Sequence, residues 1–174
     1  MSETETTTEV ADPKVLLAHH LKKLKLPTIL AEYDKQARLC AEQGIDHPRY
    51  LLRLAELELI ERERKMVERR IRAAKFPAPK SLDSFDFKAI PTLNKLLVLE
   101  LARCAFVARR ENIIALGPSG TGKTHLATAL GFAACTQGRR VRFWSATALV
   151  THMLELREQR DLKRFFGQVE KHDL

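Results

Sequence analysis

Apolar residues recur at helical spacing from residue 13 to residue 75. Intervals of three and four positions predict an amphipathic helix through Leu16, Leu17, Leu21 and Leu24. Pro27-Thr28 breaks this pattern and starts a second helix, which carries apolar residues as far as Cys40 and stops at Gly44. Asp46-His-Pro48 then opens a long third helix. The pattern therefore predicts a helical N-terminal domain over residues 13–75.

The third predicted helix changes character along its length. Its front half is apolar, whereas its back half mixes glutamates with the basic residues Arg62, Arg64, Lys65, Arg69, Arg70, Arg72 and Lys75. Three interpretations stay open: a basic helix along a phosphate backbone, a solvent-exposed helix with i,i+4 ion pairs, or contact with a protein partner. The sequence holds no base-reading module, so any DNA binding is expected to be independent of sequence.

The pattern changes from residue 92 onward. An apolar stretch over 92–107 predicts a helix buried on most sides. A short apolar run at 113–116 predicts one strand, and the alternating, edge-like segment 140–144 predicts a second. Helices are expected through Phe132 after the first strand, and through Leu156 and over 162–171 after the second. Alternating strands and helices indicate a parallel α/β sheet with right-handed crossovers. Two strands cannot bury both faces of a sheet, so we expect a thin core and exposed apolar edges.

A glycine-rich octapeptide lies between the first predicted strand and its helix. It reads Gly117, Pro118, Ser119, Gly120, Thr121, Gly122, Lys123 and Thr124, and it fits the P-loop pattern G-x-x-x-x-G-K-[ST]. A loop between a strand and a helix start directs backbone N–H groups at a phosphate chain. We expect Lys123 to reach the β- and γ-phosphates of ATP and the Thr124 hydroxyl to bind Mg²⁺.

The acidic residue that usually completes such a site is missing from the sequence pattern. P-loop NTPases also hold Mg²⁺ through an acidic group at the end of a neighbouring apolar strand. After Thr124 the only aspartates are Asp161 and Asp173, and neither follows a run of four apolar residues. Asp173-Leu174 resembles the start of the missing strand. We therefore expect the chain to end one strand too early, and we assign no catalytic residue.

Residues 76–91 form a linker between the two regions. Three prolines and a cluster of serines and aspartates prevent a continuous helix there. Phe85 and Phe87, two positions apart, are expected to anchor the linker under the following domain; alternatively, one of them borders the adenine ring. The predicted organisation is thus an acidic disordered tail (1–12), a helical domain (13–75), a linker (76–91) and a partial ATPase domain (92–174).

Charge and composition narrow the class of partner and the compartment. The formal net charge is +8, and the four acidic residues of the first twelve leave +12 on the rest of the chain. This excess favours a polyanionic partner or well-solvated basic helix faces. Cys40, Cys104 and Cys135 are far apart and are interpreted as buried thiols in a reducing compartment. The tail has no signal-peptide core and no stretch approaches the roughly eighteen apolar residues of a membrane span, so the prediction is cytoplasmic.

The histidines carry no metal signal. His19 and His20 are adjacent but have no partner at ligand spacing, and the others are isolated in the sequence. His125 directly follows the P-loop threonine and is expected to lie on a helix face. We assign none of the histidines to metal binding or to acid–base chemistry.

These motifs together resemble the IstB family, the ATPase helper proteins of insertion-sequence transposition. The matching features are Leu82–Phe87, the loop with its extension Gly117–Ala127, Ala129–Gly131, Gly138, Val141 with Phe143, and Ala146–Val150. The family is similar to the helicase loader DnaC and belongs to the AAA+ class. A P-loop alone is shared by many families. The Gly-Lys-Thr-His-Leu-Ala run together with the Phe-Asp-Phe element is specific to far fewer of them.

The resemblance implies a fold and a set of partners. It implies an α/β protein in which a helical N-terminal domain precedes the first part of a P-loop AAA+ parallel-sheet domain. It also implies ATP and Mg²⁺ as cofactors, DNA and a transposase as partners, and a homo-oligomer around duplex DNA. The acidic strand, the sensor strand, the arginine finger and the lid of the family have no counterpart in residues 1–174, so we do not expect the family's hydrolytic activity from the resemblance. The alternatives are a DnaC-type helicase loader, a non-enzymatic DNA or protein interaction module, and a gene remnant without function.

Overall fold

The computed structural model describes residues 12–174, so positions 1–11 of the predicted acidic tail lie outside the described residues. The chain divides into two compact units, Met1–Lys65 and Met66–Leu174. We call them the N-terminal unit and the C-terminal unit. The long helix α3 (His47–Ala74) contributes to both, and each unit is described separately.

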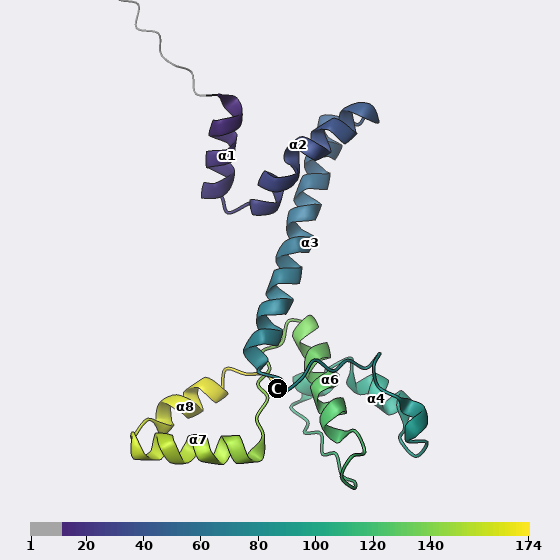
Figure 1. Cartoon of the computed structure of the whole chain (residues 1–174), viewed down its shortest axis with the longest axis vertical. Helices are drawn as coiled ribbons and strands as arrows, with labels where there is room; N and C mark the ends of the chain where they lie inside the picture. Colours follow the sequence, from purple (N-terminus) through teal and green to yellow (C-terminus); the bar gives the residue numbers. More distant parts are fainter. Residues whose placement is uncertain (1–11) are drawn as a thin grey trace, which may run out of the picture. The chain divides into compact units, whose positions relative to one another are not determined.

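The N-terminal unit is helical, as the periodicity predicted. It contains α1 (Pro13–Lys23), α2 (Pro27–Glu42) and the front of α3 (Figure 1). Leu21, Cys40 and Leu54 are its buried apolar residues, one from each helix. Asp12 caps α1 by accepting a hydrogen bond from the Lys14 N–H at 2.9 Å. The Tyr50 hydroxyl of α3 donates to the Tyr33 carbonyl of α2 at 3.0 Å. A local cap on α1, buried apolar residues and a bond between α2 and α3 thus support this unit.

Helix α2 receives its N-terminal cap from another helix. Leu26 precedes α2 and has no side chain that can cap it. Instead the buried Glu58 carboxylate of α3 accepts hydrogen bonds from the Thr28 and Ile29 N–H groups at 2.8 and 3.1 Å. Arg62 donates its Nε–H to the same carboxylate at 2.9 Å. This arrangement satisfies the free amides of the helix start and pairs the buried charge.

Burial and hydrogen bonding act in opposite directions on Glu58. Burial raises the pKa of this carboxyl, but the hydrogen bonds from Arg62, Ile29 and Thr28 together outweigh burial and hold the pKa below its ordinary value. The unfolded chain then binds the proton more tightly than the folded one. This stabilisation is therefore present above the ordinary carboxyl pKa of about 4.3 and is lost as the pH falls through the folded value.

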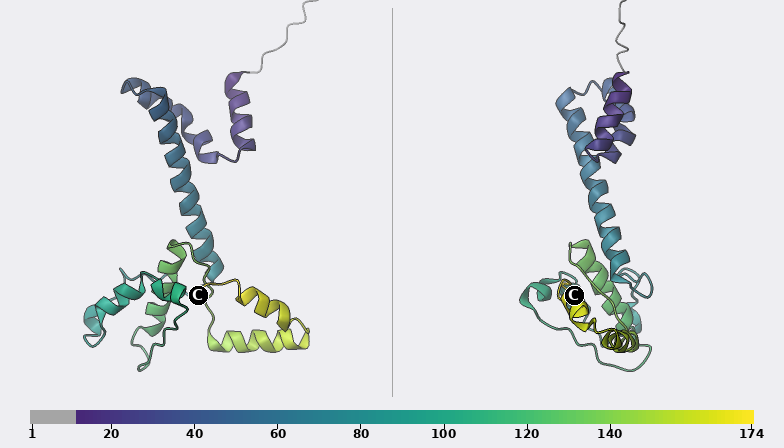
Figure 2. Two further views of the ribbon diagram at one scale, coloured as in Figure 1. Left: turned by 180° about the vertical axis from the view of Figure 1, so that it is seen from behind. Right: turned by 90° about the vertical axis from the view of Figure 1, so that its left-hand side faces the viewer.

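The C-terminal unit is organised around α6 (Lys123–Thr136). Its other helices are α4 (Lys95–Leu101), α5 (Ala105–Arg109), α7 (Ala146–Glu158) and α8 (Leu162–Val169), with a short 3-10 turn η1 at Phe87–Ala89. α7 and α8 form a helical hairpin (Figure 2). Ser145 caps α7 by accepting a hydrogen bond from the Ala148 N–H at 3.2 Å.

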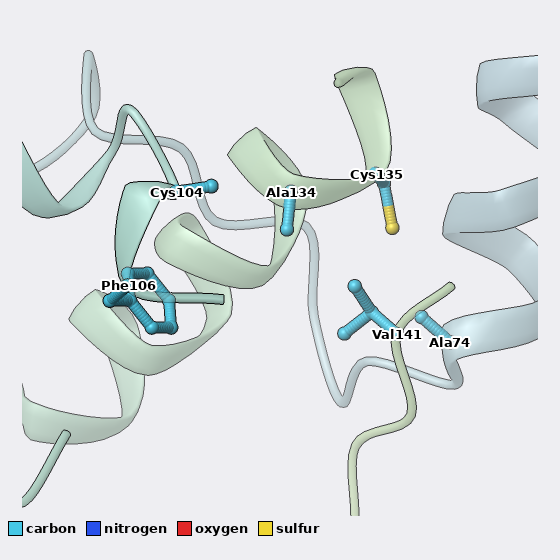
Figure 3. Close-up of a cluster of buried hydrophobic side chains, with 6 residues drawn as sticks. All are labelled: Ala74, Cys104, Phe106, Ala134, Cys135 and Val141. Atoms are coloured by element: carbon cyan, nitrogen blue, oxygen red, sulfur yellow. The ribbon is translucent and has the colours of Figure 1, made fainter. Parts of the chain in front are cut away.

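Small side chains of α6 form the core of this unit. Ala134 and Cys135 face Val141 and the end of α3 at Ala74, and Cys104 and Phe106 complete the cluster (Figure 3). All three cysteines are free and buried, as expected from the sequence. At Gly131 a Cβ would lie 2.7 Å from the Phe76 ring. The missing side chain therefore lets Phe76 pack directly on the helix.

The helix predicted over 92–107 is broken in two. Cys104, between α4 and α5, has a left-handed backbone with φ of 57°. This turn brings both Cys104 and Phe106 into the core, where they are almost fully buried. The prediction that the stretch is buried on most sides was also wrong, because Leu96 is 78% exposed and Leu97 is 50% exposed. The apolar pattern was read as one continuous face, whereas α4 buries only Val98 and the chain turns at Cys104 before Phe106 is buried.

The two predicted strands are not formed among residues 12–174, where no strand is assigned. Ile114 and Leu116 are 80% and 89% exposed, so the first predicted strand has no neighbour. At the second, the Leu174 N–H donates to the Arg140 carbonyl at 3.3 Å and the Arg142 N–H donates to the Leu174 carbonyl at 2.9 Å. These two bonds match one rung of a parallel ladder. A single rung does not make a sheet, and the exposed apolar edges agree with the expectation of a thin core.

We predict that Glu58→Gln destabilises the protein by about 1–2 kcal/mol at pH 7, because the neutral amide loses the charged bonds to Arg62 and to the start of α2. Thermal unfolding followed by circular dichroism from pH 7 to pH 3 measures this, and the variant is expected to lose less stability on acidification than the parent. Glu56→Gln is the matched control, since Glu56 is exposed on the same helix. Equal effects of the two substitutions would contradict the capping role.

We predict opposite effects for alanine at two helical glycines. Gly131→Ala drives a Cβ into the Phe76 ring and is expected to cost about 1–3 kcal/mol. Gly167→Ala in α8 places its Cβ where no described atom lies within 4 Å, so it is expected to stabilise by up to about 1 kcal/mol. Denaturant titration of both variants measures these changes. A neutral Gly131→Ala would show that Phe76 does not depend on the close approach.

Candidate nucleotide-binding site

The glycine-rich loop leads directly into α6, as the motif predicted. Gly120 and Gly122 have φ of +80° and +76°, in the left-handed region that favours glycine. Gly122 is the residue before the helix, and Lys123 is its first residue. Substitution at either glycine would strain the backbone. The loop conformation therefore depends on the residue types that the motif demands.

Lys123 folds back onto its own loop. Its Nζ donates to the carbonyls of Gly117 at 2.9 Å and Pro118 at 2.5 Å, and Thr121 Oγ1 lies 3.5 Å away. The Thr121 hydroxyl also donates to the Pro118 carbonyl, at 2.9 Å. These bonds close the loop around the ammonium group. A phosphate oxygen placed here would replace backbone carbonyls as the acceptor for the lysine.

The start of α6 fits an anion. Among the described side chains none caps this N-terminus, and the Leu126 N–H makes a backbone bond to the Gly122 carbonyl at 2.9 Å. The amides of the first turn precede that bond and have no helical acceptor. No described atom lies within 4 Å of a Cβ built at Gly120, and Ser119 and Thr124 are exposed. Free amides, an open loop tip and the positive end of a helix suit a phosphate chain.

The linker packs against the end of the loop. Phe85 is buried, and its ring lies 2.8 Å from a Cβ built at Gly122. It contacts the His125 ring edge-on, with centroids 5.1 Å apart, and the Phe87 ring at 4.8 Å. The anchor interpretation of Phe85 is therefore confirmed. Phe87 is half-buried, and the Lys95 Nζ lies over its ring, 5.3 Å from the ring centroid.

Sequence reasoning missed the contacts of His125. Its Nε2 lies 3.0 Å from the Ser81 carbonyl and 3.3 Å from Ser84 Oγ. Only the position of His125 directly after Thr124 marked it in the sequence. Nothing local connects it to a serine some forty residues earlier in the chain.

A cavity of about 810 Å³ opens beside the loop. Gly117, Pro118, Thr121 and Lys123 line one part of it, and mostly apolar residues of α4, α6, 113–116 and 141–144 line much of the rest, together with the polar Thr92, Glu111, Asn112 and Arg142. Residues of both predicted strands, 113–116 and 141–144, line it. The polar loop residues therefore border an apolar space.

Three acidic residues near the loop or after it in the sequence have partners elsewhere. The Glu111 carboxylate pairs with Arg109 at 2.9 Å, and Asp161 pairs with Arg164 at 3.8 Å. Asp173 accepts a hydrogen bond from the Arg140 N–H at 2.8 Å. Across residues 12–174, no three His, Cys, Asp or Glu side chains gather as a metal site. Over the same residues no helix combines the length and apolarity needed to cross a membrane.

Comparison with known proteins places this loop in a family. Residues 19–174 match the family described as IstB-like ATP binding protein. A putative insertion sequence ATP-binding protein of Sinorhizobium fredii is 36% identical over 155 residues, covering 88% of this chain and 52% of the relative. The IS21 putative ATP-binding protein of Pseudomonas aeruginosa is 34% identical over 149 residues, covering 86% and 56%.

A third relative, the IS5376 putative ATP-binding protein of Geobacillus stearothermophilus, is 31% identical over 151 residues, covering 87% of this chain and 60% of the relative. The chain thus spans little more than half the length of the curated relatives that it matches. The family match covers the glycine loop, α6 and the linker together. The chain belongs to the family of IstB-like ATP-binding proteins.

Proposed function

We propose that this chain binds ATP with Mg²⁺ through Gly117–Thr124 and serves as an ATP-binding helper in the transposition of an insertion sequence. The observation that carries the proposal is the glycine loop, left-handed at Gly120 and Gly122, that runs straight into the start of α6. The names of the relatives, which describe insertion-sequence ATP-binding proteins, support the biological setting.

Each loop residue has a distinct role in this proposal. The amides of the loop and of the first turn of α6 hold the phosphate chain. Lys123 exchanges the carbonyls of Gly117 and Pro118 for β- and γ-phosphate oxygens, and the exposed Thr124 hydroxyl takes Mg²⁺. ATP, when bound, supplies a transferable γ-phosphoryl group and a charge that the loop can recognise. Pro118, Ser119 and Thr121 contribute mainly through the backbone and through the bond that closes the loop.

The proposed partners are DNA, a transposase and further copies of the chain, in the cytoplasm. Along α3, Glu61 pairs with Arg64 at 2.7 Å and with Lys65 at 3.3 Å, which supports the ion-paired interpretation for that stretch. Sequence-independent DNA contact is proposed for the basic turn after α6, which holds Arg139 and Arg140. Leu59 and Ile60, 65% and 64% exposed on α3, are apolar surface that a homo-oligomer could cover.

We predict that Lys123→Ala lowers ATP affinity at least about tenfold, since a charge-assisted bond to phosphate contributes more than a kcal/mol. Isothermal titration calorimetry with ATP and Mg²⁺ measures the change. Lys163→Ala, at an exposed position of α8, is the matched control and is expected to bind like the parent. Unchanged affinity in Lys123→Ala would overturn the assignment of the loop.

We predict that Thr124→Ala removes most of the gain in ATP affinity that Mg²⁺ provides, because the metal loses its protein oxygen. Thr124→Ser keeps the hydroxyl and is expected to retain that gain. Titrations with Mg²⁺ and with a chelator separate the two. A Thr124→Ala variant with the full Mg²⁺ effect would show that another group holds the metal.

A further inference from the structure

We infer that the turn Ser81–Phe85 is a clasp on the P-loop, through which nucleotide binding is transmitted to the linker, with His125 and Phe85 as positioning residues. This inference rests on the proposed ATP binding and deepens it. Nothing in it requires either residue to touch the nucleotide. The clasp is defined here as Ser81, Ser84 and Phe85 on the linker with Gly122 and His125 on the loop and α6.

The polar half of the clasp is the His125 ring. Its Nε2 lies 3.0 Å from the Ser81 carbonyl, which can only accept, so this nitrogen carries the hydrogen. The Ser84 hydroxyl, 3.3 Å from the same nitrogen, itself donates to the Ser81 carbonyl at 2.9 Å. The serine turn is thereby closed on itself and attached to the first turn of α6.

The apolar half of the clasp is the Phe85 ring. Phe85 is 8% exposed, and its ring occupies the space that a side chain at Gly122 would need. The same ring meets His125 edge-on, at an interplanar angle of 89°. Gly122 and His125 are therefore held by one aromatic side chain from the linker.

The position of these two contacts along the chain has a mechanical consequence. Lys123 and Thr124 lie between Gly122 and His125, so the two residues proposed to hold phosphate and Mg²⁺ are flanked on both sides by clasp contacts. Any movement of this short segment when Lys123 leaves its loop carbonyls displaces the Phe85 ring or the Ser81 bond. Conversely, a linker that is held in place keeps the loop ready for the ligand.

Limited trypsin digestion of the full chain tests the inference. Lys80 and Lys88 flank the clasp and both are exposed. Saturating ATP with Mg²⁺ is expected to slow cleavage at these lysines by at least about threefold, because a ligand that favours the clasped state reduces the open population. His125→Leu is expected to bind ATP within about tenfold of the parent and to lose that protection. His125→Gln is expected to restore part of it, since its amide can donate to the Ser81 carbonyl.

His47→Leu is the matched control, because His47 also lies in the first turn of a helix, and it is expected to keep the protection. Should His125→Leu fail to fold by circular dichroism, Phe85→Leu takes its place and is expected to lose the protection likewise. Failure of the parent to bind ATP in calorimetry would overturn the proposed function and the clasp together. ATP binding with unchanged cleavage in the parent, or protection that survives in both His125→Leu and Phe85→Leu, would overturn the clasp alone.

Discussion

Close packing around helix α6 determines where the glycine loop lies. Much of the helix is buried, and most of its buried side chains are small. Ala129, Gly131, Ala134 and Cys135 allow Phe76 and the end of α3 to come within contact of the helix. Because the backbone is held closely at these positions, the start of the helix is also held. The P-loop therefore projects from the most firmly packed element of the C-terminal unit.

Several large apolar residues of the C-terminal unit have no packing partner and remain exposed. Leu96, Ile114 and Leu116 are all more than three-quarters exposed, and an apolar cavity lies beside α6. A strand needs a neighbouring strand for its amides and carbonyls, which the helical segments do not provide. The single rung between Val141 and Leu174 shows that the backbone can pair there when a second extended segment is present.

The two units each contain a charged side chain with several hydrogen-bond partners, and the partners differ in kind. In the N-terminal unit a buried carboxylate, Glu58, is satisfied by two helix amides and one arginine, so it holds α2 and α3 in register. In the loop, the ammonium group of Lys123 donates to neutral backbone carbonyl oxygens. A carboxylate held by three donors is structural, whereas an ammonium held by neutral acceptors can exchange them for a phosphate. This contrast is the physical basis for assigning a ligand to the loop and none to Glu58.

The sequence by itself determined the features that depend on near neighbours. Periodicity and the breaks at Pro27 and Gly44 predicted most helices, and the glycine motif predicted the loop and the start of α6, because these depend on bonds spanning a few residues. Tertiary structure alone decided the Glu58 cap, the left-handed turn at Cys104, and the contact of His125 with Ser81. It also decided that the apolar run at 113–116 and the alternating segment 140–144 do not become strands. These features depend on which distant segments meet in space, and local apolar patterning carries no information about that.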